Sequence, residues 1–164
     1  MNADAVLDLF DYNVWSHQRV WDCVMQADES IWTRSSGYSL DTLQAQYVHV
    51  LSVDQRWFGR VRQVELPARL EASAFPTRAS LWTAWETTQQ AHRAYLAGAT
   101  DDDMTHVLEF DMSHRGGMKR HPAWQIFTHV VNHGTDHRAQ ILATLHMLGA
   151  PTTEQDMMFY WWSK

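Results

Sequence analysis

Apolar residues recur along this chain with the 3.6-residue period of amphipathic helices, in four stretches separated by helix breakers. A serine at an N-cap, a proline in a first turn and a glycine just past a last turn are typical boundary residues. On these signals the four predicted helices cover residues 4–27, 40–66 with Ser39 as N-cap, 78–97 after Pro76 and Thr77, and about 122–149 from Pro122 to Gly149. The pattern therefore predicts an all-α protein.

The segment before the last predicted helix breaks the helical period. Residues 104–120 alternate weakly and contain Gly116 and Gly117, a pair that suits the turn of a β-hairpin. No internal repeat or linker divides the chain, so we expect residues 1–164 to form a single domain. The expected architecture is a four-helix bundle with a short hairpin before the last helix.

The last residues of the chain form an unusually apolar run, MMFYWW. Exposed aromatic surface of this kind usually marks an interface. We therefore expect a homodimer, and the alternative is that the tail folds back over its own bundle.

Composition disfavours several classes of function. The chain has 13 Lys and Arg against 19 Asp and Glu, and a net charge of -6 gives no overall attraction to a nucleic acid. Its single cysteine, Cys23, can form no disulfide within the chain, which fits a reducing cytoplasm. No apolar run reaches the ~18 to 20 residues that a membrane span needs, and no basic signal-peptide start is present. We expect a cytoplasmic protein that binds neither nucleic acid nor membrane.

The sequence is unusual in containing ten histidines. His129, His133 and His137 recur every fourth residue of the last predicted helix, and the outer two are about 12 Å apart along its axis, too far for one ion. On a helical wheel, His137 lies about 40° from the centre of the apolar face, His133 about 80° and His129 about 120°. The inward pair is therefore His133 and His137. Gly134 follows His133 and no glutamate lies between the pair, which excludes an HExxH protease motif.

Two imidazoles on one helix need a further ligand from another helix to hold a divalent metal. His17, His49 and His92 lie in the other predicted helices, and the pattern favours His49 only slightly. Each histidine could instead be a hydrogen-bonded core residue. Polar Asn13 and His17 interrupt an otherwise apolar stripe, however, and several polar groups that converge on one core favour a common site. We expect these two residues to line it.

Three sequence motifs extend this interpretation over nearly the whole chain. The first motif is HVVNHGTDHRAQILATLHMLGAP, an NH..DHRAQ core followed by a Leu-rich turn. The second is YVHVLSVDQRWFGRV, in which a His precedes an acidic residue and a Trp. The third, near the start of the chain, is YNVWSHQRVWDCV. Together they resemble the signature of the DinB family of DinB/YfiT-like bundles. The resemblance implies a right-handed up-down-down-up bundle with a divalent metal held by His49, His133 and His137.

The resemblance also implies a cofactor and a chemistry. The metal would be zinc or nickel in the first place, and iron or manganese in the second, since imidazoles suit several of these ions. Thiol-dependent S-transferases and isomerases among the relatives imply a low-molecular-weight thiol as a substrate. Asp136 and Ala139 differ from the usual His and Gly of the family signature without touching a ligand. His17 stands where the family often has Asn, which alters a polar wall of the expected cavity.

Three neutral imidazoles leave a metal its positive charge and open coordination positions, as in catalytic sites. We expect an enzyme that activates a thiol for transfer or water for hydrolysis, acting on a small molecule. Gln140 is a candidate to orient His137, Asp54 is a further possible helper, and Arg56 or Arg138 could bind a carboxylate unless both only line a solvated helix face. The alternative is a non-catalytic dimeric bundle that binds metal or a ligand in a stress-related role.

Overall fold

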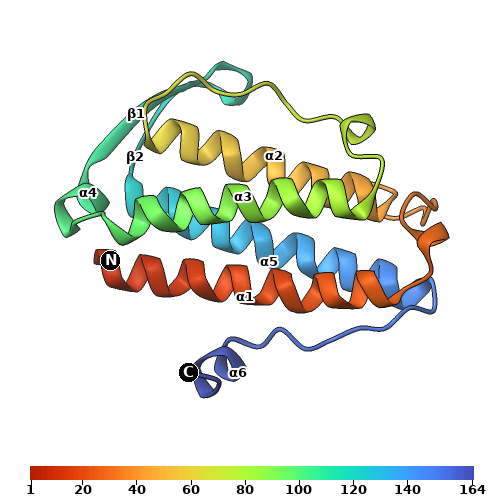
Figure 1. Cartoon of the computed structure of the whole chain (residues 1–164). Helices are drawn as coiled ribbons and strands as arrows, with labels where there is room; N and C mark the ends of the chain where they lie inside the picture. Colours follow the sequence, from red (N-terminus) through yellow and green to blue (C-terminus); the bar gives the residue numbers. More distant parts are fainter.

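The computed structural model describes residues 1–164, and most of them are helical. Two short helices and a small antiparallel sheet accompany four long helices that lie side by side (Figure 1). The elements are α1 (Ala3–Gln26), α2 (Leu43–Val61), α3 (Arg78–Ala97), α4 (Asp101–Thr105), β1 (Val107–Met112), β2 (Gly117–Pro122), α5 (Ala123–Met147) and α6 (Met157–Trp162). The predictions of a mostly helical protein and of a hairpin before the last long helix are confirmed. No helix combines the length and apolar character needed to cross a bilayer.

The long helices pack in a closed ring, since α1 and α2 each contact both α3 and α5. Figure 1 shows that α1 and α5 run in one direction and that α2 and α3 run in the other. This arrangement is possible because the segment between α2 and α3 crosses back along the length of the helices (Figure 1). The β-hairpin contacts α2 and the start of α5, and it lies at one end of the long helices.

The helix α2 is shorter than the sequence predicted at both ends. Thr42, not Ser39, is its N-cap, because the Thr42 hydroxyl accepts a hydrogen bond from the amide three residues later. Ser39 has a left-handed φ of 52° and donates its hydroxyl to Gln140 instead. At the other end the helix stops at Val61, because Gln63 also adopts a left-handed φ of 52°. The sequence pattern missed both turns, since apolar residues continue past them.

The other long helices agree with the sequence prediction to within two residues at each end. Two short helices were not predicted. Thr100 and Asp103 form a capping box that starts α4, and the Asp156 side chain caps α6. The tail folds back on α1, where the Tyr160 hydroxyl donates to Asp8, while Met158, Phe159, Trp161 and Trp162 stay exposed.

Two apolar clusters fill the interior, one towards each end of the long helices. One contains Trp21, Tyr47 and Ile141, and the other contains Phe10 and Phe58. Buried polar side chains occupy the interior between these clusters: Asn13, Ser16, His17, Asp54, Gln89, His137 and Arg138. Buried polar groups cost stability unless they are paired, so this polar layer is where a functional site is expected.

Candidate metal centre

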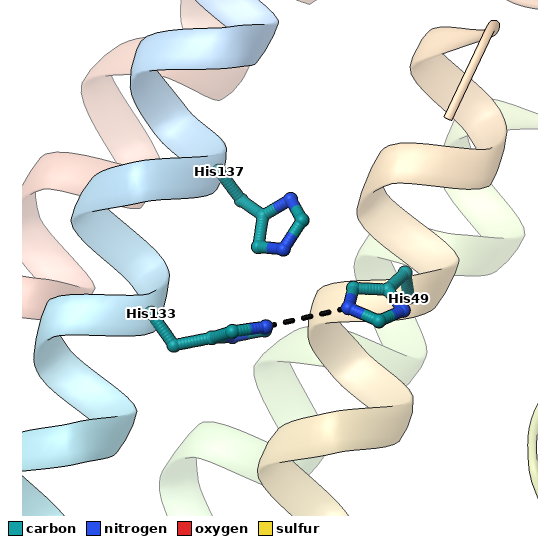
Figure 2. Close-up of side chains that lie close together, drawn as sticks. All are labelled: His49, His133 and His137. Carbon is teal, nitrogen blue, oxygen red and sulfur yellow. Dashed lines mark hydrogen bonds between the residues drawn. The ribbon is translucent and has the colours of Figure 1, made fainter. Parts of the chain in front are cut away.

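Three histidine side chains from two helices converge at this polar layer. His49 comes from α2, and His133 and His137 come from successive turns of α5. Figure 2 shows the three rings pointing towards one another across the gap between the helices. One ring nitrogen of each lies within 4.8 Å of those of the other two, and the Nε2 atoms of His49 and His133 are 3.3 Å apart. These are the three residues that the resemblance implied as ligands.

The burial of the α5 histidines follows the order expected from the helical wheel. His137 is buried, His133 is half-buried and His129 is exposed. The ring of His129 lies edge-on to Trp57 with centroids 5.0 Å apart, and this histidine is outside the converging group. The four-residue spacing therefore places two of the three imidazoles on the face towards α2 and leaves the third at the edge.

The geometry of the group fits a divalent metal. Two ligands bound at ~2.0 to 2.1 Å to a tetrahedral ion lie about 3.3 to 3.4 Å from each other. The 3.3 Å between the Nε2 atoms of His49 and His133 has this value. The group has three members and no fourth protein ligand, so coordination positions remain for a molecule from solution.

The electrostatics of the group also suit metal binding, which requires neutral imidazoles. Burial lowers the pKa of His133 to about 3, with further contributions from the neighbouring histidines. Burial lowers the pKa of His137 and of His49 as well, and the charge of Arg69 adds to the effect on His49. All three rings are therefore neutral at pH 7, with lone pairs that can bind an ion.

Gln46 fixes the orientation and tautomer of one of these rings. Its side-chain Oε1 lies 2.8 Å from Nδ1 of His137, and because an amide oxygen only accepts, Nδ1 must carry the proton. The Nε2 atom of His137 is then left with a free lone pair. A partner of this kind is typical of metal-binding histidines. Sequence reasoning missed Gln46, whose only signal is its position one helical turn before His49 on α2.

Gln140, the predicted partner of His137, contacts it only indirectly, through Gln46. Its Oε1 accepts hydrogen bonds from Gln46 Nε2 at 3.2 Å and from the Ser39 hydroxyl, and its Nε2 donates to Asp136 at 3.3 Å. Gln140 thus holds Gln46, and Gln46 holds His137. The chain of hydrogen bonds extends from the loop before α2 to the ring nitrogen.

Asn13 and His17 lie on the other side of α5, where α1 packs closely against it. A Cβ atom at Gly134 would lie 3.1 Å from His17 Nε2 and 2.9 Å from Arg138 Nη1, so this position admits no larger side chain without a shift. Asn13 accepts a hydrogen bond from Arg138, whereas His17 packs on Trp85 and neither ring nitrogen has a partner. Both side chains are fully buried behind the three histidines.

The other candidates for a third ligand lie outside the converging group. Burial, with contributions from Arg138, His133 and His137, lowers the pKa of His17 well below its usual value. His92 stacks on Phe58 with ring centroids 3.5 Å apart. Of the three helical candidates, the structure brings only His49 together with the α5 pair.

Arg138 and Asp54, which were predicted as possible helpers of the centre, have different surroundings. Arg138 is fully buried, so the alternative of a solvated helix face is wrong for it; its three nitrogens donate to Asn13, Thr135 and Gln155. Burial raises the pKa of Asp54 to about 7, and its one hydrogen bond comes from Gln89 on α3. Neither side chain contacts the three histidines. Their hydrogen bonds instead join α5 to α1 and α2 to α3.

Two cavities adjoin the centre on the side of the hairpin. The smaller, of 170 Å³, is lined by His49 itself together with Arg56 and Arg69. The larger, of 460 Å³, is lined by His129 and by apolar side chains of α2, β1 and α5. Its volume is in the range of small-molecule sites. A small molecule in the smaller cavity would lie beside His49.

Known proteins resemble this chain over nearly its whole length. The model of the DinB family matches residues 1–164. Protein DinB of Bacillus subtilis (strain 168) is 24% identical over an alignment of 168 positions, which covers 96% of this chain and 94% of that protein. The crystal structure of a DinB-like protein from Bacillus cereus ATCC 10987 matches with a TM-score of 0.64 at 16% identity, over 93% of this chain and 97% of that one. The structural match shows a shared fold.

Proposed function

The chain belongs to the DinB family, and on that premise we propose that it is a metal-dependent enzyme with a catalytic centre at His49, His133 and His137. The observation that carries the proposal is the convergence of three neutral imidazoles within 4.8 Å, with cavities beside them. Within the chain the three rings have only one another and Gln46 as hydrogen-bond partners, since His133 Nε2 lies 3.3 Å from His49 Nε2 and His137 Nδ1 lies 2.8 Å from Gln46 Oε1.

The metal in this proposal is zinc or nickel first, and iron or manganese second, because imidazole ligands suit all four. Such an ion would lower the pKa of a thiol or of water bound to it. The residues of the chain have separate tasks: His49, His133 and His137 bind the ion, Gln46 keeps the proton of His137 on Nδ1, and the cavities admit the substrate. The proposal also takes the ring of four long helices to be the up-down-down-up bundle of the family, as their directions in Figure 1 support.

Of the two reactions, we favour transfer of a low-molecular-weight thiol over hydrolysis. The resemblance to thiol-dependent relatives supports the choice. The structure offers no general base in contact with the three histidines, and a thiol needs one less than water does because its own pKa is far lower. In this proposal the substrate is a small molecule and the protein is cytoplasmic. It binds neither nucleic acid nor membrane.

The first experiment is elemental analysis of protein purified without a metal-affinity tag. Wild type should hold one divalent ion per chain, and His133→Ala should lose it because only two imidazoles remain. The control is His129→Ala, which removes a histidine one turn away that lies outside the group. Full metal content in His133→Ala, or loss in His129→Ala, would contradict the assignment.

The second experiment is a thiol-transfer screen on the metal-loaded protein, with mycothiol, bacillithiol and glutathione as donors. Activity that vanishes on chelation and returns with added metal supports the proposal. Hydrolysis of an ester or amide substrate with the same metal dependence would favour water as the activated molecule.

A non-catalytic, dimeric ligand-binding bundle with a stress-related role is the competing candidate. It is favoured by the exposed aromatic surface of α6, where Trp161 and Trp162 are 42% and 69% exposed. A homodimer is compatible with both functions, and sedimentation at micromolar concentration tests it. A dimer without turnover of any thiol or ester would favour the competing function.

A further inference from the structure

The two cavities near the centre are neighbours with a shared wall. They share Trp57 of α2 and Met112 of β1. The larger cavity has a mainly apolar wall made by Trp57, Phe110 and Ile126, and the smaller one reaches His49. A molecule that occupies both cavities would place its apolar part in the larger one and a polar group in the smaller one, near His49.

Positive charge is concentrated around these cavities. Arg56, Arg60 and Arg69 line the smaller one, and Arg115 and Lys119 line the larger one. These are five of the 13 Lys and Arg in a chain whose net charge is -6. No aspartate or glutamate lines either cavity, and none of the five takes part in an ion pair of the structure.

Arg60 shows most clearly that this charge lacks a partner. Its guanidinium lies over the ring of Trp57 at 4.7 Å and near that of Phe110 at 5.7 Å. Its terminal nitrogens donate only to neutral acceptors, the Arg56 carbonyl at 3.2 Å and Met112 Sδ at 3.5 Å, and its Nε is buried without a hydrogen bond. Burial and the neighbouring Arg56 both lower its pKa. A partly buried cation without an anionic partner costs free energy, which an anion bound from solution would offset.

Because the proposed function places the reaction at His49, the anion lies where a substrate would lie. We propose that these cavities bind a small organic carboxylate with an aromatic or similarly apolar body, as the substrate that the centre acts on. The carboxylate pairs with Arg60 and Arg69, and the apolar body packs on Trp57 and Phe110. The planar fork of arginine matches a carboxylate in two parallel hydrogen bonds. Only the statement that the carboxylate is a substrate rests on the proposed function. Binding of the carboxylate can be measured without turnover.

The test compares two probes with the same carbon skeleton and different end groups, the anionic 3-phenylpropanoate and the neutral 3-phenylpropan-1-ol, by calorimetric titration of the metal-loaded protein. The carboxylate should bind at least about tenfold more tightly, because hydrogen bonds to charged groups contribute the most. Added salt should weaken binding of the carboxylate and leave that of the alcohol unchanged. Equal affinity for both probes would overturn the inference.

Three Arg→Gln variants locate the carboxylate. Arg69→Gln, at an exposed residue without hydrogen bonds of its own, should lower the affinity for 3-phenylpropanoate by up to about fivefold. Arg60→Gln should weaken it by about tenfold or more, with a melting curve to show that the variant folds. The matched control is Arg34→Gln, which removes the same charge from an exposed position that lines neither cavity. Equal loss in all three variants would reflect net charge alone and would contradict the site.

A fourth variant separates this inference from the proposed function. In His133→Ala the carboxylate should still bind, because its arginine partners remain. Loss of binding in His133→Ala, with full binding in Arg60→Gln and Arg69→Gln, would mean that the probe ligates the metal and would overturn the site. Wild type that contains no metal but distinguishes the two probes would overturn the proposed function and support the anion site.

Discussion

The two sides of α5 use polar residues in opposite ways. Towards α2, His133 and His137 face His49 beside the cavities, with Gln46 as their hydrogen-bonded support. Towards α1, Gly134 and Arg138 lie one residue further along, which is about 100° around the helix. There the polar groups are sealed from solvent: Arg138 is hydrogen-bonded within the protein, whereas neither ring nitrogen of His17 has a partner. We call these the open side and the closed side of α5.

The comparison shows how one helix can be both reactive and fixed. On the closed side, Arg138 is held at three nitrogens by neutral partners from α1, α5 and the segment after α5. Burial lowers its pKa to about 10, so it is still charged at pH 7. Gly134 lets α1 approach closely enough for these contacts. Rigid packing on the closed side therefore sets the position from which the histidines on the open side project.

Removing the metal should affect the open side alone, and this is the largest expected effect. At a free metal concentration of 1,000 times Kd the bound ion contributes about 4 kcal/mol, which chelation removes as a lower melting midpoint. The apoprotein should stay helical, because two apolar clusters hold the long helices together. Circular dichroism measures the melting, and hydrogen exchange should rise around His49 and His133 but not around Asn13. Loss of the helices on chelation would mean that the centre is structural.

Replacing Gln46 should weaken the open side without touching its ligands. Gln46→Met removes the acceptor of the His137 proton, and loss of such a partner typically lowers metal affinity by about 10- to 100-fold. Titration against a chelating dye measures the affinity. The matched control is Gln44→Met on the same helix, which loses hydrogen bonds to the Ala72 and Phe75 carbonyls instead. Equal affinities in the two variants would remove Gln46 from the site.

Filling the closed side should reduce stability. In Gly134→Ala the new methyl group meets Arg138 at 2.9 Å as well as Asn13, and overpacking costs about 1–3 kcal/mol against a helix-propensity gain of about 1. We expect a net loss of up to about 2 kcal/mol in urea unfolding. In the control Gly98→Ala, the nearest atom lies at 3.8 Å and the change should be within about 0.5 kcal/mol. A Gly134→Ala variant as stable as wild type would show that the closed side is not tightly packed.

Acid should reduce the free energy of unfolding through His92, which lies outside the candidate metal centre. His92 is buried against Phe58, and burial lowers its pKa to about 3. Because the unfolded chain takes up this proton near pH 6.5, stability is complete above pH 6.5 and is lost as the pH falls towards 3, by up to about 1.4 kcal/mol per pH unit. His92→Gln should reduce this slope in metal-loaded and metal-free protein alike. Identical pH profiles of unfolding for the variant and wild type would contradict the effect.

Periodicity predicted much of this arrangement and left out identifiable parts. The helical wheel ordered His137, His133 and His129 by burial, because a regular helix turns each residue by a fixed angle. It could not find the ends of α2, where Ser39 and Gln63 leave the helical conformation while apolar residues continue. Local turns depend on contacts such as that of Ser39 with Gln140, which is 101 residues away in the chain.

The cationic cavities were beyond the reach of sequence patterns for a similar reason. Arg60 comes from α2, Arg69 from the crossing segment and Arg115 from the turn of the hairpin, and only the fold brings these segments together. Arg56 was predicted as a possible carboxylate partner, and it lines the smaller cavity. Gln46 was missed because a single buried glutamine has no recognisable spacing, and it gains a role only through the ring that it faces.

The position of the hairpin has a consequence for how this protein can change. The metal-facing imidazoles and their supports lie on long helices, whereas β1, β2 and the turn between them supply Phe110, Met112, Arg115 and Lys119 to the cavities. Part of the cavity lining is thus encoded in a stretch of sequence separate from the three histidines, although Trp57 and Arg60 share α2 with His49. A library of variants confined to residues 110–121 would retune which molecules are accepted while the reactive centre is inherited intact, so the same scaffold can be diversified by evolution or in the laboratory one short loop at a time.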